Sequence, residues 1–194
     1  MAHRVDLFCE DAAHEEWARA LLTRLAGEQE VEVSIQGASA RFGVGRLKRE
    51  LHAYGRLMEK ESGLPDLLVV IIDANAVGVA ARRAEITDAI DLDAFPVVAV
   101  GIPDPCVEHW LLADPTSFSE RFGEQPELPE TSDCDQWKAA LVKALERAGE
   151  IVTGGGGEFA EEIVEVMDLY RAGKASRSLK QFIDDLRAVL KRLT

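Results

Sequence analysis

The sequence predicts an α/β protein in which a parallel sheet, covered by helices on both faces, is followed by a helical extension. Three observations indicate this fold class. Short apolar runs alternate with helical patterns from residue 4 to residue 102, in the order β-α-β-α-β-α-β, which is typical of parallel strands joined by crossover helices. The run DLLVVIID at residues 66–73 is almost unbroken in its apolar character, as expected of a strand buried on both faces. After Pro105 the remaining segments have helical patterns.

Local periodicity along the chain predicts the individual strands and helices. In the first expected helix, Trp17, Leu21 and Leu25 recur at helical spacing. In the second expected strand, apolar and polar residues alternate, which is the period of a half-buried strand. The expected strands lie at residues 5–9, 31–35, 66–73 and 96–102, and the expected helices between them lie at residues 14–28, 46–60 and 79–90.

The C-terminal part is expected to be helical, with helices at residues 107–114, around Phe118, and at 135–149, 158–173 and 178–193. We expect an α/β domain over residues 1–123 and a helical extension over 134–194 packed on it, with the Pro- and Glu-rich residues 124–133 as a linker or a surface loop. The last helix has an apolar stripe that either joins the core or forms the face of a homo-oligomer. The stripe consists of Leu179, Phe182, Ile183, Leu186, Val189, Leu190 and Leu193.

Composition limits the kinds of function. The chain has 194 residues, 47% of them hydrophobic, and a formal net charge of −13. Because an acidic surface repels phosphates, affinity for nucleic acid needs a local basic patch, a bound metal or a partner protein. The three cysteines lack CxxC spacing, which argues against structural zinc and a disulfide framework. No apolar run approaches the roughly 20 residues that cross a bilayer, so we expect a cytoplasmic protein outside the membrane.

Acidic residues stand where the expected strands end. Glu10 follows the first strand, Asp73 ends the third, and Glu108 comes shortly after the fourth. Because the carboxyl ends of parallel strands meet at one edge of the sheet, these carboxylates are expected to converge there. Carboxylate oxygens are the ligands that Mg²⁺ prefers, so the sequence predicts a metal site.

Two neighbouring residues extend the candidate ligand set, and each also has a structural interpretation. Asn75 lies two residues after Asp73, so both side chains can project to the same side of an extended segment. Glu15 lies in the first turn of the helix after Glu10. Alternatively, Asp73 and Asn75 cap the next helix, Glu15 only stabilises the helix dipole, and Glu108 is an exposed residue of a first helical turn.

A basic stretch precedes the third strand and is a candidate for contact with nucleic-acid phosphates. It contributes Arg41, Arg46, Lys48 and Arg49. The alternative is a solvated helix face whose cations pair with neighbours such as Glu50. The histidines His14, His52 and His109 are dispersed without the spacing of a metal-binding helix, so they are not predicted to be zinc ligands. The GGGG run at residues 154–157 lacks the lysine and the preceding strand of a phosphate loop, which favours a turn.

The ordered segments FCEDAAHEEW, VVIIDANAVGVA and IPDPCVEHWLLAD resemble the acidic motifs of TOPRIM-like proteins, in particular the small RloB-type proteins associated with phage defence. The resemblance spans residues 4–114. It implies a four-stranded parallel TOPRIM sheet and phosphodiester chemistry that depends on Mg²⁺ or Mn²⁺. It assigns Glu10, Asp73 and Glu108 to catalysis and metal binding.

The sequence departs from this pattern at two positions, where Asp11 replaces the usual glycine and Asn75 replaces the second aspartate. The resemblance implies a nuclease that acts in antiviral defence with a partner such as an ATPase. The loss of one carboxylate and the acidic surface favour the alternative, a catalytically silent TOPRIM-like subunit that binds a partner or regulates it.

Overall fold

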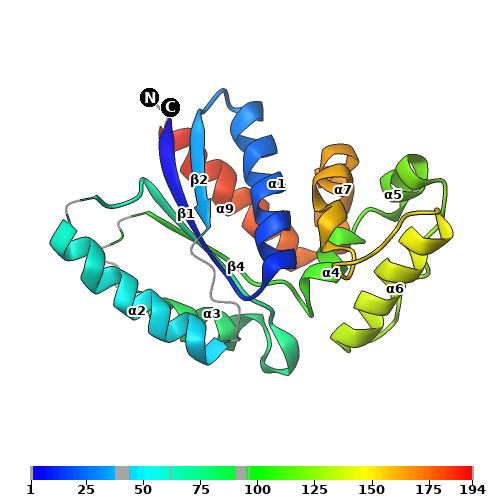
Figure 1. Cartoon of the computed structure of the whole chain (residues 1–194), viewed down its shortest axis with the longest axis horizontal. Coiled ribbons are helices and arrows are strands. Elements are labelled where there is room, and N and C mark those ends of the chain that lie inside the picture. The colour runs from blue at the N-terminus through cyan, green and yellow to red at the C-terminus, as the bar shows by residue number, and fades with distance from the viewer. Residues whose placement is uncertain (1, 38–43, 62, 91–94, 96, 194) are drawn as a thin grey trace.

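The computed structural model describes residues 2–37, 44–61, 63–90, 95 and 97–193. The fold is α/β, with a four-stranded, fully parallel sheet of order β2-β1-β3-β4 flanked by helices (Figure 1). This confirms the predicted fold class. The strands are β1 (His3–Cys9), β2 (Val33–Gly37), β3 (Leu67–Ile71) and β4 (Val98–Gly101).

Helices connect the strands and continue after the last one. The first three are α1 (Ala12–Glu28), α2 (Val44–Glu61) and α3 (Val79–Thr87), with the short 3-10 turn η1 (Asn75–Val77) before α3. The later elements are α4 (Val107–Leu111), α5 (Pro115–Phe122), α6 (Cys134–Arg147), η2 (Gly157–Phe159), α7 (Ala160–Val166), α8 (Leu169–Ala175) and α9 (Arg177–Leu193).

Strands β1, β3 and β4 contribute alternate residues to two cores, one on each face of the sheet. In β3, Leu67, Val69 and Ile71 join the core beneath α1, α4, α7 and α9. The residues between them, Leu68 and Val70, join the smaller core beneath α2 and α3. This is the period-two projection of a strand covered on both faces, and it explains why residues 66–73 are so uniformly apolar.

The helical extension is part of the larger core. In α9, Leu179, Phe182, Ile183, Leu186 and Leu190 are buried in the same cluster as Val5 of β1 and Trp17 of α1, so the apolar stripe packs within the chain. The phenyl ring of Phe182 passes so close to Gly101 of β4 that a Cβ there would lie 3.1 Å from it. Residues 124–133 join α5 to α6.

The expected helix at residues 158–173 is wrong in one respect, because the chain breaks it at Met167 and Asp168. Met167 adopts an extended ψ of 127°, and the Asp168 carboxylate accepts bonds from the backbone N–H groups of Tyr170 and Arg171, which starts α8. The Arg24 guanidinium donates to the carbonyl oxygens of Val164 and Met167 at 2.5 and 2.6 Å. Side chains therefore satisfy the backbone carbonyls at the end of α7 and the backbone N–H groups at the start of α8.

Candidate metal centre

Two predicted site residues, Glu10 and Asp73, meet at the carboxyl edge of the sheet. Strands β1 and β3 pair with Cys9 opposite Ile71, so the residues that follow each strand leave the sheet side by side. The backbone N–H of Asp73 donates to Oε2 of Glu10 at 3.2 Å. The parallel register therefore joins residues 63 positions apart in the chain.

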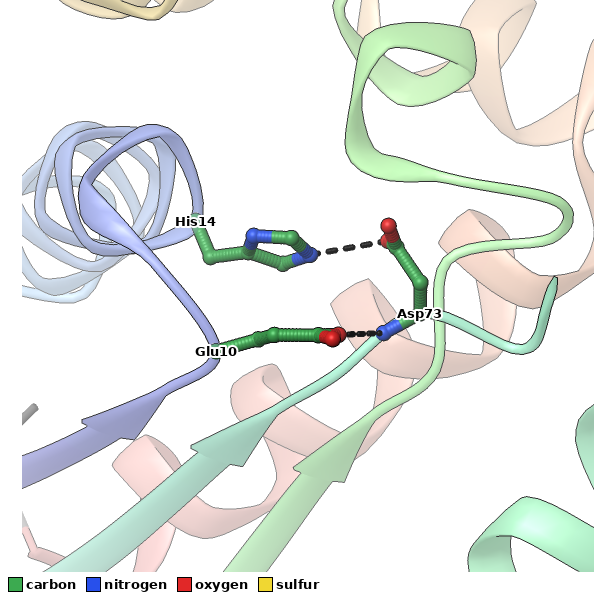
Figure 2. Close-up of side chains that lie close together, drawn as sticks. All are labelled: Glu10, His14 and Asp73. Atoms are coloured by element: carbon green, nitrogen blue, oxygen red, sulfur yellow. Dashed lines mark hydrogen bonds and ion pairs between the residues drawn. The ribbon is translucent and has the colours of Figure 1, made fainter. Parts of the chain in front are cut away.

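His14 completes this group from the first turn of α1. Its side chain is 2% exposed, and its Nε2 lies 2.8 Å from Oδ1 of Asp73, whose side chain is 13% exposed. Its Nδ1 lies 2.7 Å from Oδ1 of Asp11, the residue that also caps α1 by accepting from the backbone N–H of His14. Figure 2 shows the imidazole reaching across to Asp73 above the Glu10 carboxylate.

The three side chains are close enough to share one cation. One potential ligand atom from each of Glu10, His14 and Asp73 lies within 4.8 Å of the others. With Nδ1 held by Asp11, Nε2 is the nitrogen that faces the two carboxylates. A carboxylate behind a histidine is a common support for a metal-bound imidazole, because it orients the ring and increases its basicity. The arrangement can thus hold a divalent ion.

The electrostatics of the group reflect burial and close opposite charges. Burial by itself lowers the pKa of His14, but the Asp73 and Asp11 carboxylates outweigh it and place that pKa well above its ordinary value. Burial raises the pKa of Glu10, and the nearby Asp73 charge adds to the effect. For Asp11, the bonds to His14 outweigh burial and lower the pKa to about 2. The carboxylates on either side of the ring therefore favour its protonated form.

Glu108 lies in the first turn of α4, close to the group but outside it. Burial raises the pKa of its carboxyl, and the Asp73 charge raises it further, whereas the Cys106 thiol lowers it by hydrogen bonding. The charge of Asp73 therefore influences Glu108, although Glu108 does not belong to the trio that can share an ion.

The amide of Asn75 is directed toward α6. Its Oδ1 accepts a bond from the Cys134 thiol at 3.3 Å, and the backbone N–H of Asn75 donates to the carbonyl of Pro105 at 3.1 Å. Its φ is 48°, a left-handed conformation that Asn tolerates better than most residues. The amide oxygen is thus committed to a structural contact.

Glu15 is directed toward β2 and is paired with Arg19. Its Oε1 accepts from Nε and Nη2 of Arg19 at 3.1 and 2.9 Å, and the same guanidinium donates to the carbonyl of Ile35 at 3.0 Å. The pair fastens α1 to β2 and lies outside the trio.

Of the predicted phosphate-binding residues, Arg41 lies outside the described residues. Arg46 pairs with Glu50 at 2.6 Å, and Arg49 is exposed on α2. Lys48 contacts Glu85 of α3 at 3.1 Å. The pairing of Arg46 with Glu50 is the one expected of a solvated helix face.

Sequence reasoning missed two residues of this edge, His14 and Arg82. The buried Arg82 donates to the carbonyl of Asp73 at 3.1 Å and to Glu85 at 2.7 Å, so it fixes the segment after β3. For His14, a signal was available, since it lies four residues after Glu10 and three after Asp11, at a junction of strand and helix. No comparable signal marks Arg82.

The chain belongs to the family described as a domain of unknown function, DUF4276, which matches residues 9–187. The match includes Glu10, His14, Asp73 and Glu108. No curated protein and no solved structure matches the chain. Among the described residues, no helix has both the length and the apolar character needed to cross a bilayer.

Proposed function

We propose that this protein is a divalent-metal-dependent hydrolase of phosphodiester bonds in nucleic acid, with a TOPRIM-like site. One observation carries the proposal: ligand atoms of Glu10, His14 and Asp73 converge within 4.8 Å at the carboxyl edge of a parallel sheet. This is the edge at which open α/β sheets bind their ligands. The resemblance of the acidic segments to TOPRIM-like motifs supplies the reaction type.

Each side chain has a distinct role in this proposal. Glu10, Asp73 and Nε2 of His14 hold the metal, and Asp11 orients the imidazole through Nδ1. A bound divalent ion supplies an activated water and stabilises the charge that develops on the phosphate. Burial and the Asp73 charge raise the pKa of the Glu108 carboxyl. Glu108 therefore either accepts a proton from the attacking water or donates one to the leaving group.

The donor set favours Mn²⁺ over Mg²⁺. Mg²⁺ prefers an all-oxygen shell, whereas an imidazole nitrogen beside carboxylates suits softer divalent ions of the first transition row. The resemblance implies either Mg²⁺ or Mn²⁺, and of these two ions Mn²⁺ accepts the imidazole of His14 more readily.

Calorimetric titration tests the metal centre. We expect Mn²⁺ to bind the wild type more tightly than Mg²⁺, and Asp73→Asn and His14→Gln to weaken Mn²⁺ binding by about tenfold or more. Asp88→Asn and His52→Gln are matched controls, because these exposed residues lie in other parts of the chain, and they should bind Mn²⁺ as the wild type does. Equal affinity in the wild type and Asp73→Asn would rule out the trio as the metal centre.

Cleavage assays test the reaction. Supercoiled DNA, single-stranded DNA and RNA are incubated with the protein and Mn²⁺. Cleavage is expected to disappear in Asp73→Asn and to fall in Glu108→Gln with metal binding intact.

The resemblance extends the proposal to an antiviral effector that works with an ATPase. If so, Asp73→Asn abolishes protection against phage in cells that carry the complete locus.

The second candidate is a catalytically silent module that binds a partner protein. The contact of Asn75 with Cys134 favours it, because the position that would carry a second aspartate is used to hold α6. Metal binding by the wild type without cleavage of any of the three substrates, together with unchanged phage protection in Asp73→Asn, would select this candidate.

A further inference from the structure

The last two helices have a charge opposite in sign to that of the whole chain. Residues 168–192 contain seven Lys or Arg and three Asp or Glu, whereas the chain has a formal net charge of −13. These residues lie on α8 and α9, which pack against each other. Because the average surface repels polyanions, this local excess of cations marks a place where a polyanion can approach.

A groove of about 650 Å³ runs along these helices. Four cationic side chains line it: Arg24 from α1, Lys174 from α8, and Lys180 and Arg187 from α9. Apolar residues of the turn between α7 and α8 form part of its wall. A cationic groove with an apolar wall suits a ligand that combines negative charge with flat apolar groups.

The cations of this groove can exchange their present partners for a phosphate. Lys180 pairs with Asp184, and Arg187 pairs with Glu28, and all four side chains are between 38% and 62% exposed. Exposed pairs of this kind contribute little to stability and are screened by salt. The other carboxylate of the lining, Asp168, is already bound to two backbone N–H groups of α8.

An exposed aromatic ring lies in the same groove. Tyr170 is 70% exposed, which is unusual for a large side chain in this protein. The Lys174 ammonium lies over its ring, 4.4 Å from the centroid. Grooves that bind single-stranded nucleic acid combine cations, which follow the phosphates, with aromatic rings on which bases stack.

We propose that this groove binds single-stranded nucleic acid, with phosphates at Lys174, Lys180 and Arg187 and a base stacked on Tyr170. The inference rests on the proposed function for the identity of the polyanion. It deepens that function, because it places the contact with nucleic acid on α8 and α9. The basic stretch of the sequence had predicted this contact on α2. Trp110 of α4 donates to Ser178 of α9 at 2.9 Å, so the helix that carries Glu108 contacts the helix that carries Lys180 and Arg187.

Fluorescence anisotropy in EDTA tests the groove separately from catalysis. The probes are labelled 20-nucleotide dT and rU strands and a 20-base-pair duplex. Replacing Lys174, Lys180 and Arg187 together by Ala should weaken binding of single strands at least tenfold. It should also reduce the slope of log K against log salt by about 2, because each phosphate contact in a single strand contributes roughly 0.7. Arg46→Ala with Arg49→Ala on α2 is the control and should bind as the wild type does.

The stacking contact has its own pair of variants. Tyr170→Ala should lose about tenfold in affinity, whereas Tyr170→Phe retains the ring and should bind as the wild type does. The groove assignment is overturned if the triple variant binds normally or if the α2 control loses affinity instead. It is also overturned if the duplex or poly-glutamate binds more tightly than both single strands. If the groove does not bind single strands, the Mn²⁺ titration and the cleavage assay still decide the proposed function. If Mn²⁺ does not bind the trio, the anisotropy measured in EDTA still decides whether the groove binds single strands.

Discussion

At the scale of single residues, the buried carboxylate of Asp114 shows how one side chain fastens separate helices. It caps α5 by accepting from the N–H of Ser117, and it accepts from the N–H of Asp168 at 2.8 Å. The Arg171 guanidinium donates to both of its oxygens, at 3.0 and 3.2 Å. The start of α5 and the start of α8 are therefore joined through one group.

We predict that Asp114→Asn lowers the free energy of unfolding by about 2 kcal/mol, because it removes the charged acceptor of Arg171 while keeping the shape. Asp114 is 2% exposed, but Arg171 is 46% exposed, and solvent screening of Arg171 reduces the loss. Urea unfolding measures the change. The exposed Asp135→Asn is the control and should change stability by less than about 0.5 kcal/mol.

The same carboxylate predicts a pH dependence. Burial by itself raises the pKa of Asp114, but the bonds from Arg171, the N–H of Asp168 and Ser117 outweigh it and lower that pKa. A carboxyl with a lowered pKa stabilises the fold above its unfolded pKa of about 3.9, and this contribution is lost as the pH falls below that value. The wild type should therefore lose its advantage over Asp114→Asn as the pH falls below about 4 and through the lowered pKa of the folded protein. A difference that does not shrink as the pH falls would contradict the assignment.

At the scale of elements, the glycine-rich turn before α7 is built around its own carboxylate. Glu158 accepts bonds from the N–H groups of Thr153, Gly154 and Gly156 at 2.6 to 2.8 Å. The backbone donors of this turn are thus satisfied within the chain, which supports the interpretation of the GGGG run as a turn. Gly156 has a φ of 94°, and a Cβ there would lie 2.7 Å from Leu141 of α6.

Two glycine substitutions should change stability in opposite directions, and the first of them tests this turn. Gly156→Ala should destabilise the protein by about 2 kcal/mol, because it combines an unfavourable φ with a contact that Leu141 has to relieve. Gly27→Ala in α1 meets nothing within 4 Å and should stabilise by about 0.5 to 1 kcal/mol, since Ala favours the helix. Thermal melting followed by circular dichroism measures both. A neutral Gly156→Ala would mean that the turn rearranges freely.

At the scale of the whole molecule, the α/β part and the helical extension share one buried core. That core reaches from Val5 in β1 to Leu190 in α9. Phe182 stacks against Trp110 of α4, with ring centroids 5.6 Å apart, and Trp17 of α1 adds a third ring. We therefore expect the chain to unfold as one cooperative unit.

The substitution Leu186→Ala tests this cooperativity. Leu186 is fully buried in α9, so the cavity should cost about 3 kcal/mol. Circular dichroism and tryptophan fluorescence should shift to the same lower urea midpoint, because the three tryptophans are in other helices. Gln181→Ala, at an exposed position of the same helix, should leave the midpoint unchanged. Two separate midpoints in Leu186→Ala would show that the extension unfolds on its own.

The sequence by itself determined the fold class, the order of the strands along the chain and the meeting of Glu10 with Asp73. These follow from local periodicity and from the rule that parallel strands end at one edge. Only the tertiary structure decided that His14 joins them, that Glu15 and Asn75 are bound elsewhere, and that the helix at residues 158–173 breaks. Each of these depends on a partner distant in sequence, such as Asp73 for His14 and Cys134 for Asn75. Periodicity reports which face of an element is buried, whereas strand register and helix packing decide which polar groups come within bonding distance.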